Sequence, residues 1–278
     1  MRNFKERAAK AVFTAAACIC ILAVALICVF LFVNGLPAMA KIGVLDFLLG
    51  KTWRPGNDIY GILPMVLGSV YVTGGALVIG VPIGVLTAIY LSRFAGSTAA
   101  RLLKPAVRLL AGIPSVVYGF FGMIVIVPLL GARGSMLAAC ILLGIMILPT
   151  VITVSESALN AVPQSYYEGA LALGATHERA VFKVLLPAAG SGVTASVILG
   201  IGRAIGEAMA VMMVAGNQPR MPQGLLKGVR TLTANIVMEM GYSADLHREA
   251  LIATAVVLFV FILAINILFA VIKRRAKV

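Results

Sequence analysis

The chain has 278 residues, of which 61% are hydrophobic and only 12% are charged, and its mean hydropathy is +1.05. A soluble domain of this length cannot bury so much apolar surface, so the composition excludes a soluble globular protein and indicates a membrane protein. The net charge of +13 would suit a nucleic-acid-binding protein, but most basic residues flank apolar runs, as lipid headgroups favour, and we expect no nucleic-acid partner.

Six apolar runs are long enough to cross a bilayer as helices, which needs about 20 residues each. The runs are continuous rather than alternating, which excludes a β-barrel, and a helix satisfies its own backbone groups in lipid. The sequence therefore predicts an all-α, polytopic protein with about six transmembrane helices. The predicted spans are 12–33, 63–91, 106–130, 136–154, 190–216 and 249–272.

The basic residues also predict how the chain is oriented. Both terminal tails and the loops 92–108 and 155–189 together hold 14 of the 23 basic residues, whereas the remaining loops hold eight, and the positive-inside rule places the richer side in the cytoplasm. The loops 34–62 and 217–248 are then external. We divide the chain into two parts. Residues 1–62 hold the N-terminal cytoplasmic tail, the first transmembrane helix and the first external loop, and residues 63–278 hold a membrane core that includes the cytoplasmic loop 155–189.

The first external loop carries two aromatic residues, Trp53 and Tyr60, which we interpret as anchors at the membrane surface. Its stretch GKT at 50–52 ends like a phosphate-binding P-loop. Leu45, however, stands where the first glycine of that motif belongs, so the backbone cannot form the phosphate cradle. His177 and His247 are isolated in the sequence. We expect no catalytic residue, no metal site and no cofactor bound by this chain.

The third predicted span begins with a break at Gly112–Pro114. Irregular backbone at membrane depth lines a cavity or is enclosed by protein. The alternative is close helix packing through small residues such as Gly119 and Gly122. The sequence supports the two interpretations about equally.

The loop 155–189 is too elaborate to be a simple connection between two spans. Pro163 precedes a segment whose Ser165 and Glu168 have the spacing of a capping box, and Gly174 suits the left-handed conformation at a helix end. Thr176 can cap a second helix, and Pro187 suits the start of the next span. The sequence predicts two short cytoplasmic helices with a glycine corner between them.

The same loop resembles the EAA motif of ABC-importer permeases, E-A-A-x3-G-x9-I-x-L-P. The matching residues have the spacing of the motif throughout, although glycine replaces the second residue and valine replaces the isoleucine. The resemblance implies the type I importer (MetI-like) permease fold and a coupling helix that docks on an ATP-binding subunit. The matching residues are Glu168, Gly169, Ala170, Gly174, Val184, Leu186 and Pro187.

Other stretches, including LAGIPSVVYG, GRAIGEAMAV and VAGNQP, are similar to the PstC-type permease of phosphate importers. This resemblance extends from Trp53 to the C-terminus. The first span resembles the family only in being an apolar segment, not in its individual residues. It implies a multi-pass protein of the bacterial inner membrane that imports inorganic phosphate. It also implies three partners: a second, related permease (PstA type), two copies of an ATPase that binds ATP and Mg²⁺ (PstB type), and an external phosphate-binding protein (PstS type).

Arg203 and Glu207 lie within the fifth predicted span. A central charge costs about 2.5–3.5 kcal/mol even on insertion scales, so such residues are usually functional. At i and i+4 the two side chains share one helix face and can pair. The arginine fork suits the oxygens of phosphate, and Gly200, Gly202 and Gly206 leave space nearby. The alternative is a permanent ion pair that fixes helix packing.

Four further side chains are candidates to line the substrate pathway, although hydroxyl groups in membrane helices often bond only to their own helix. Three other functions remain open: a permease of the same fold for sulfate or molybdate, a secondary transporter with Arg203 and Glu207 as a proton relay, and a structural membrane scaffold. The four candidates are Thr73, Ser69, Ser115 and Tyr118.

Overall fold

The computed structural model describes residues 2–131 and 133–275, so the end of the predicted cytoplasmic tail, 276–278, lies outside the described residues. The regular structure of the described part is helical apart from one two-stranded hairpin, in which Trp53 pairs with Tyr60, and an isolated bridge between Gly216 and Val229. In chain order the elements are α1 (Arg2–Ile42), α2 (Val44–Leu49), β1 (Trp53–Arg54), η1 (Pro55–Asn57), β2 (Ile59–Tyr60), α3 (Leu63–Ile89), η2 (Tyr90–Phe94), α4 (Ser97–Gly112), α5 (Ser115–Phe121), η3 (Gly122–Ile126), α6 (Val127–Leu129), α7 (Met136–Asn160), α8 (Gln164–Ala172), α9 (His177–Ala180), η4 (Val181–Leu185), α10 (Leu186–Ala188), α11 (Gly190–Gly206), α12 (Met209–Val214), α13 (Leu232–Glu239) and α14 (Asp245–Arg275).

Four helices of the described chain are long and apolar enough to cross a membrane, and there are six spans if each of two bent pairs counts as one. The prediction of about six spans is confirmed in that sense. The third span bends by 99° between α4 and α5, at the predicted break before Ser115. The fifth predicted span, 190–216, is not continuous, because α11 ends at Gly206 and α12 begins at Met209.

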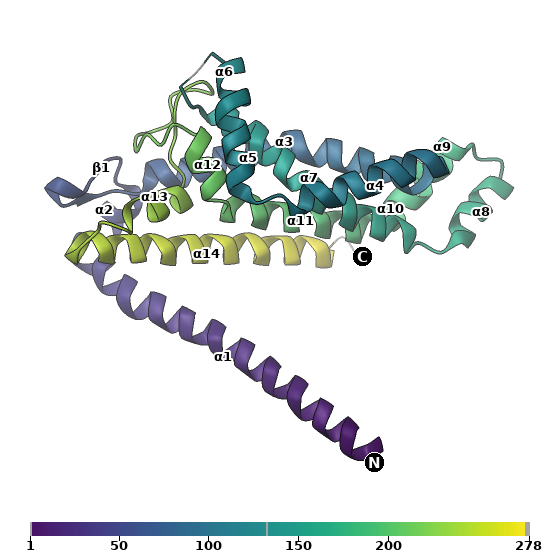
Figure 1. Cartoon of the computed structure of the whole chain (residues 1–278), viewed down its shortest axis with the longest axis horizontal. Helices are drawn as coiled ribbons and strands as arrows, with labels where there is room; N and C mark the ends of the chain where they lie inside the picture. The colour runs from purple at the N-terminus through teal and green to yellow at the C-terminus, as the bar shows by residue number, and fades with distance from the viewer. Residues whose placement is uncertain (1, 132, 276–278) are drawn as a thin grey trace.

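The bundle is elongated, with different elements at its two ends (Figure 1). The hairpin and α2 lie at one end, and α8 and α9 lie at the other. The C-terminal end of α14 points toward the end that carries α8. Helix α1 contacts α14 near Gly35 and then diverges from the body (Figure 1). The most apolar stretch of α1 is not buried by the rest of the chain.

Helices α3 and α7 form the centre of the bundle, and glycines allow them to approach closely. A methyl group added at Gly80 would lie 2.7 Å from the carbonyl oxygen of Gly144, and one added at Gly84 would lie 2.8 Å from Val151. Small residues are typical of such contacts in membranes, where packing rather than burial from water holds helices together. Ile147 of α7 is fully buried at this contact.

The aromatic residues Trp53 and Tyr60 of the loop 34–62 are not membrane anchors. Trp53 and Tyr60 are only 4% and 2% exposed, and they pack with Phe47 and Leu251 in a separate core at the hairpin end of the bundle. The interpretation as surface anchors was therefore wrong. These rings are buried because α13 and the start of α14 cover the hairpin, and a sequence reading of the loop alone does not include that cover.

Candidate functional site

Arg203 lies in the last turn of α11 and is partly buried. One Nη1 hydrogen of its guanidinium is donated to Oγ1 of Thr150, on α7, over 3.4 Å. A long hydrogen bond to one neutral oxygen leaves most of the five guanidinium donors available. Arg203 therefore presents a charge that no carboxylate neutralises within residues 2–131 and 133–275.

Glu207 does not pair with Arg203, so the predicted i, i+4 ion pair was wrong. Helix α11 ends at Gly206, and Glu207 has an extended backbone with φ −74° and ψ 120°. Its Oε1 instead accepts a hydrogen bond of 3.1 Å from the backbone N–H of Ala210, at the start of α12. The ion pairs of the described residues do not include these two side chains, because the helix break removes the shared face that the spacing required.

The glycines near Arg203 differ in what surrounds them. A methyl group added at Gly200 would lie 3.3 Å from Val151, so this glycine serves helix packing. At Gly202 and Gly206 such a methyl group would meet nothing within 4 Å. The space next to Gly202 and Gly206, at the end of α11 that carries Arg203, is therefore open.

The four candidate hydroxyl residues have separate roles in the structure. Ser69 is buried and accepts a hydrogen bond of 2.9 Å from the backbone N–H of Leu232. The Tyr118 hydroxyl is donated to the carbonyl oxygen of Leu110 over 2.8 Å, which joins the two helices of the bent third span.

The other two candidates, Thr73 and Ser115, are buried and half-buried respectively. No hydrogen bond joins either hydroxyl to Arg203 within residues 2–131 and 133–275. The actual partner of Arg203, Thr150, was missed by sequence reasoning. The signal available was a hydroxyl residue beside Pro149 within an apolar run.

The glycine corner of the loop 155–189 is confirmed. Gly174 has a φ of +83°, and its backbone N–H is donated to the carbonyl of Leu171 over 2.9 Å. The N–H of Ala175 is donated to the carbonyl of Ala170 over 3.1 Å. These two bonds form a Schellman motif, which ends a helix with a residue in the left-handed conformation.

The caps of the two short helices differ from each other. Thr176 caps α9 as predicted, since its Oγ1 accepts from the backbone N–H of Arg179 over 3.4 Å. The predicted capping box at Ser165 and Glu168 was wrong. Helix α8 begins at Gln164, directly after Pro163, and no side chain caps it. The fixed φ of proline already positions the chain for a helix.

The motif residues lie where a partner can reach part of them. Glu168 and Gly169 are exposed on α8, whereas Ala170 is half-buried. Leu186 and Pro187 are in α10, just before the 68° bend into α11. Beside the corner, Leu173 is 91% exposed.

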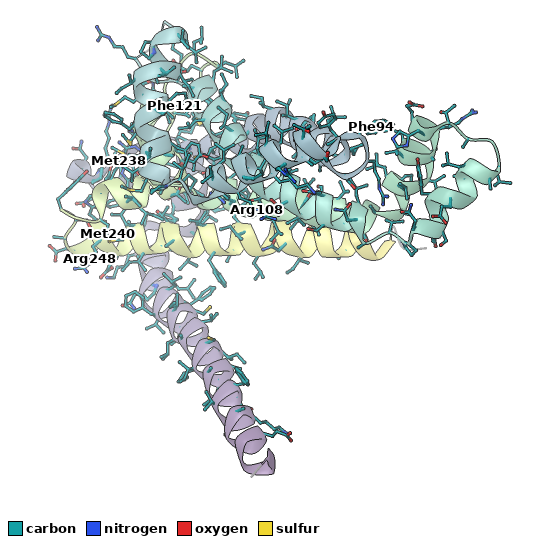
Figure 2. All side chains as sticks on the ribbon, turned by 45° about the vertical axis from the view of Figure 1, so that its right-hand side comes forward. Phe94, Arg108, Phe121, Met238, Met240 and Arg248 are labelled. Atoms are coloured by element: carbon teal, nitrogen blue, oxygen red, sulfur yellow. The ribbon has the colours of Figure 1, made fainter. Side chains whose placement is uncertain are left out.

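A cluster at the base of this loop was not found from the sequence. The Tyr167 hydroxyl and Nδ1 of His177 are 2.7 Å apart, and the His177 ring meets the edge of Phe94 at 4.6 Å between centroids. Figure 2 labels Phe94 near the end of the bundle that carries α8 and α9. His177 is therefore not isolated in the fold, since it joins α8, α9 and the end of α3.

The segment η2 continues α3 as a π-helical turn, a local form that often marks functional sites. From this turn, Arg93 donates one hydrogen bond of 3.1 Å to the carbonyl of Leu159 and another of 3.4 Å to the side chain of Gln164. Arg93 thereby holds the end of α7 and the start of α8, while Phe94 contacts His177. The start and the middle of the loop 155–189 are therefore both held by the η2 turn.

A second polar cluster holds the hairpin end of the bundle together. The buried carboxylate of Glu239 pairs with Arg230, accepts from Nε1 of Trp53 over 2.8 Å, and lies 2.8 Å from Nε2 of His247. Asn235 accepts a further hydrogen bond from Arg230. Among the described residues, His, Cys, Asp and Glu form no group of three or more that could hold a metal ion.

The comparisons with known proteins agree with this arrangement. The model of the family described as the binding-protein-dependent transport system inner membrane component matches residues 80–278. The probable ABC transporter permease protein YqgH of Bacillus subtilis is 37% identical over 100% of this chain and 94% of that protein. The phosphate transport system permease protein PstC of Xylella fastidiosa is 30% identical over 93% of this chain and 87% of that protein.

Solved structures show the same fold. A chain of the MetNI methionine ABC transporter has a TM-score of 0.60 at 23% identity, covering 78% of this chain and 94% of that chain. A bacterial ABC transporter that imports alginate has a TM-score of 0.61 at 13% identity, covering 97% and 99%. The chain is an all-α, multi-pass membrane protein with the MetI-like permease fold, and it belongs to the family of inner-membrane components of binding-protein-dependent ABC importers.

Proposed function

We propose that the chain is a transmembrane subunit of an ATP-driven importer of inorganic phosphate and that it forms the pathway together with a second, related permease. It hydrolyses no ATP itself. A PstB-type ATPase dimer supplies the energy, and a PstS-type protein delivers phosphate from outside. Relatives named as PstC phosphate permeases, about 30% identical over most of the chain, support the substrate.

Arg203 is the observation that carries the proposal. Its guanidinium lies beside open space at Gly202 and Gly206, and its one hydrogen bond within the described residues is to a neutral hydroxyl. A guanidinium can bind two oxygens of one phosphate through paired donors. A cation without a carboxylate partner is costly in lipid, and binding of an anionic substrate offsets that cost during transport.

The loop between α7 and α11 fits the coupling role. Its exposed helix α8 and the exposed Leu173 lie at one end of the bundle, and η2 connects the loop to α3, which packs along α7. Closure of a partner ATPase against α8 would therefore move the spans that surround Arg203. In this proposal the α8 end and both termini face the cytoplasm.

The test is uptake by the purified importer in proteoliposomes. The chain is co-purified with its neighbouring subunits, and radiolabelled phosphate is supplied with the external binding protein on one side and ATP on the other. We expect uptake that requires ATP and is not reduced by excess sulfate or molybdate. Competition by sulfate or molybdate would favour the other-oxyanion alternative. ATP-independent uptake without an ATPase would favour a secondary transporter, although the separation of Arg203 from Glu207 removes the relay that the sequence suggested.

A further inference from the structure

Helix α7 carries a row of polar side chains on one face, starting at the partner of Arg203. Thr150, Thr153, Ser157 and Asn160 are spaced by three, four and three residues, which places them along one side of a helix. Thr153, Ser157 and Asn160 are exposed on this otherwise apolar helix. Polar groups on a membrane helix face a wet cavity or protein rather than lipid, so this face continues away from Arg203 toward the end that carries α8.

A cavity of about 140 Å³ lies along this row, between α7, α4 and the η2 turn. Since a water molecule occupies about 30 Å³ in the liquid, the cavity has room for a tetrahedral oxyanion. Its polar lining combines two cations, one carboxylate, two hydroxyls and an amide, so its formal charge is positive. These residues are Lys104, Arg108, Thr153, Glu156, Ser157 and Asn160.

Several of these groups already have partners. Lys104 forms an ion pair of 2.7 Å with Glu156, Ser157 donates to the carbonyl of Thr153 over 2.8 Å, and Asn160 accepts from Ser92 over 2.7 Å. Glu156 is therefore neutralised by Lys104. The charge that remains in the cavity is the charge of Arg108.

Arg108 has no hydrogen-bond or ion-pair partner within residues 2–131 and 133–275. It lies one helical turn after Lys104 on α4, so both cations face the same cavity. Along the bundle, Arg108 lies between Arg248, near the hairpin end, and Phe94, near α8 (Figure 2). The hydroxyl of Thr153 is likewise without a partner in the described chain and can donate into the same space.

We propose that this cavity is a second oxyanion site, which binds a phosphate group on the α8 side of Arg203. The inference rests on the proposed function and extends it. The guanidinium of Arg108 binds two phosphate oxygens, and the hydroxyl of Thr153 donates to a third. Glu156 pairs with Lys104, so that only one unpaired cation faces the phosphate and the anion can still be released. A phosphate ion released by Arg203 thus has a next position along the face of α7.

The test measures whether phosphate protects a thiol placed in the cavity. The four native cysteines are replaced by serine, Ser157→Cys is introduced, and the assembled importer is purified with its partner subunits in maltoside micelles. An uncharged thiol reagent is added with inorganic phosphate or with chloride at equal ionic strength. We expect phosphate to slow modification several-fold, Arg108→Gln to abolish this protection, and the matched control Arg101→Gln, on the same helix but outside the cavity, to keep it.

A second arm distinguishes the two sources of a phosphate group. In phospholipid nanodiscs without inorganic phosphate, protection that depends on Arg108 would identify a lipid headgroup as the occupant, whereas protection that follows added phosphate in both media would identify the free ion. Protection in neither medium, or equal protection in Arg108→Gln, would overturn the site. Phosphate uptake by the same preparation in proteoliposomes is measured separately. Phosphate uptake without protection of the thiol would rule out only this second site. Protection of the thiol without phosphate uptake would rule out only the proposed import function.

Discussion

The hydroxyl of Tyr167 and Nδ1 of His177 lie 2.7 Å apart and join the two short helices across the corner at Gly174. The His177 ring in turn meets Phe94 at the end of α3. A movement of α8 can therefore reach α3 without passing through the nine residues that separate Tyr167 from His177 along the chain. This contact makes the loop one unit rather than two independent helices.

Tyr167→Phe removes this hydrogen bond and keeps the ring. The loss of one hydrogen bond costs about 0.5–1.5 kcal/mol, too little to prevent assembly. We expect normal co-purification with the partner subunits and a several-fold fall in phosphate imported per ATP hydrolysed. Tyr166→Phe is the matched control, because Tyr166 is exposed and its hydroxyl has no hydrogen bond within the described chain. Equal coupling in both variants would rule out this role for Tyr167.

Gly174→Arg tests the corner itself. The φ of +83° strains arginine and most other residues that carry a Cβ atom, at about 1–3 kcal/mol, although a side chain there would meet no atom within 4 Å. We expect normal membrane insertion, lost uptake, and ATP hydrolysis that no longer responds to the binding protein. Gly174→Asn should retain most activity, because asparagine tolerates the left-handed conformation. Near-normal uptake and stimulated hydrolysis in Gly174→Arg would contradict the coupling role.

Arg203→Lys keeps the charge and loses the planar fork. If Arg203 binds phosphate, uptake should fall at least about tenfold, in keeping with the loss of a bidentate contact, while co-purification of the complex stays intact. Glu207→Gln should be milder, because a glutamine oxygen can still accept from the Ala210 N–H that Glu207 now caps. The double variant Arg203→Gln with Glu207→Gln should assemble but import nothing. Normal uptake in the double variant would leave Arg203 with a structural role only.

Glu239→Gln tests the polar cluster at the hairpin end. The side chains of Glu239 and Arg230 are 7% and 10% exposed, and removing one partner of a buried pair costs about 3–5 kcal/mol. We expect a clear drop in thermal stability, measured by melting in detergent. Glu249→Gln is the matched control. Its pair with Lys41 is exposed, so that substitution should cost about 0–1 kcal/mol. Equal melting temperatures for the two variants would show that the cluster adds nothing.

Tyr60 gives a dependence on pH. Burial first, then the hydrogen bond to Asp58 and the charge of Asp58, raises the pKa of Tyr60 from 10.0 to about 12. A raised pKa means that the unfolded chain ionises before the folded one, so the stabilising contribution is complete below pH 10 and is lost as pH rises toward 12. The difference in phenolate absorbance between the parent protein and Tyr60→Phe, measured as a function of pH, should have its midpoint near pH 12. A midpoint at 10 would mean that this ring is open to water.

Features set by local chemistry were predictable. Continuous apolar runs identified the spans, Gly174 identified a left-handed corner, and Thr176 identified a helix cap, because each depends on residues within a few positions. The EAA-like spacing predicted the family for the same reason. The break at Gly112–Pro114 was also readable, although its angle of 99° depends on what the two helices pack against.

Features set by distant partners were not predictable. Arg203 binds Thr150, 53 residues earlier in the chain, and Trp53 is buried against Glu239, 186 residues later. The end of α11 at Gly206 was missed because glycines inside membrane helices often serve packing, as Gly200 does. The i, i+4 spacing makes Glu207 a partner of Arg203 only in a continuous helix, and α11 ends between the two residues.

The isolation of α1 has a consequence for how the sequence can evolve. Its most apolar stretch makes no buried contact with the remainder of the chain, so within this subunit a substitution there needs no compensating change elsewhere. Selection from the subunit's own fold acts on length and hydropathy, and many sequences satisfy both. Helix α7 is the opposite case: most of its apolar stretch is buried against neighbouring helices, so a substitution there needs changes in the helices around it.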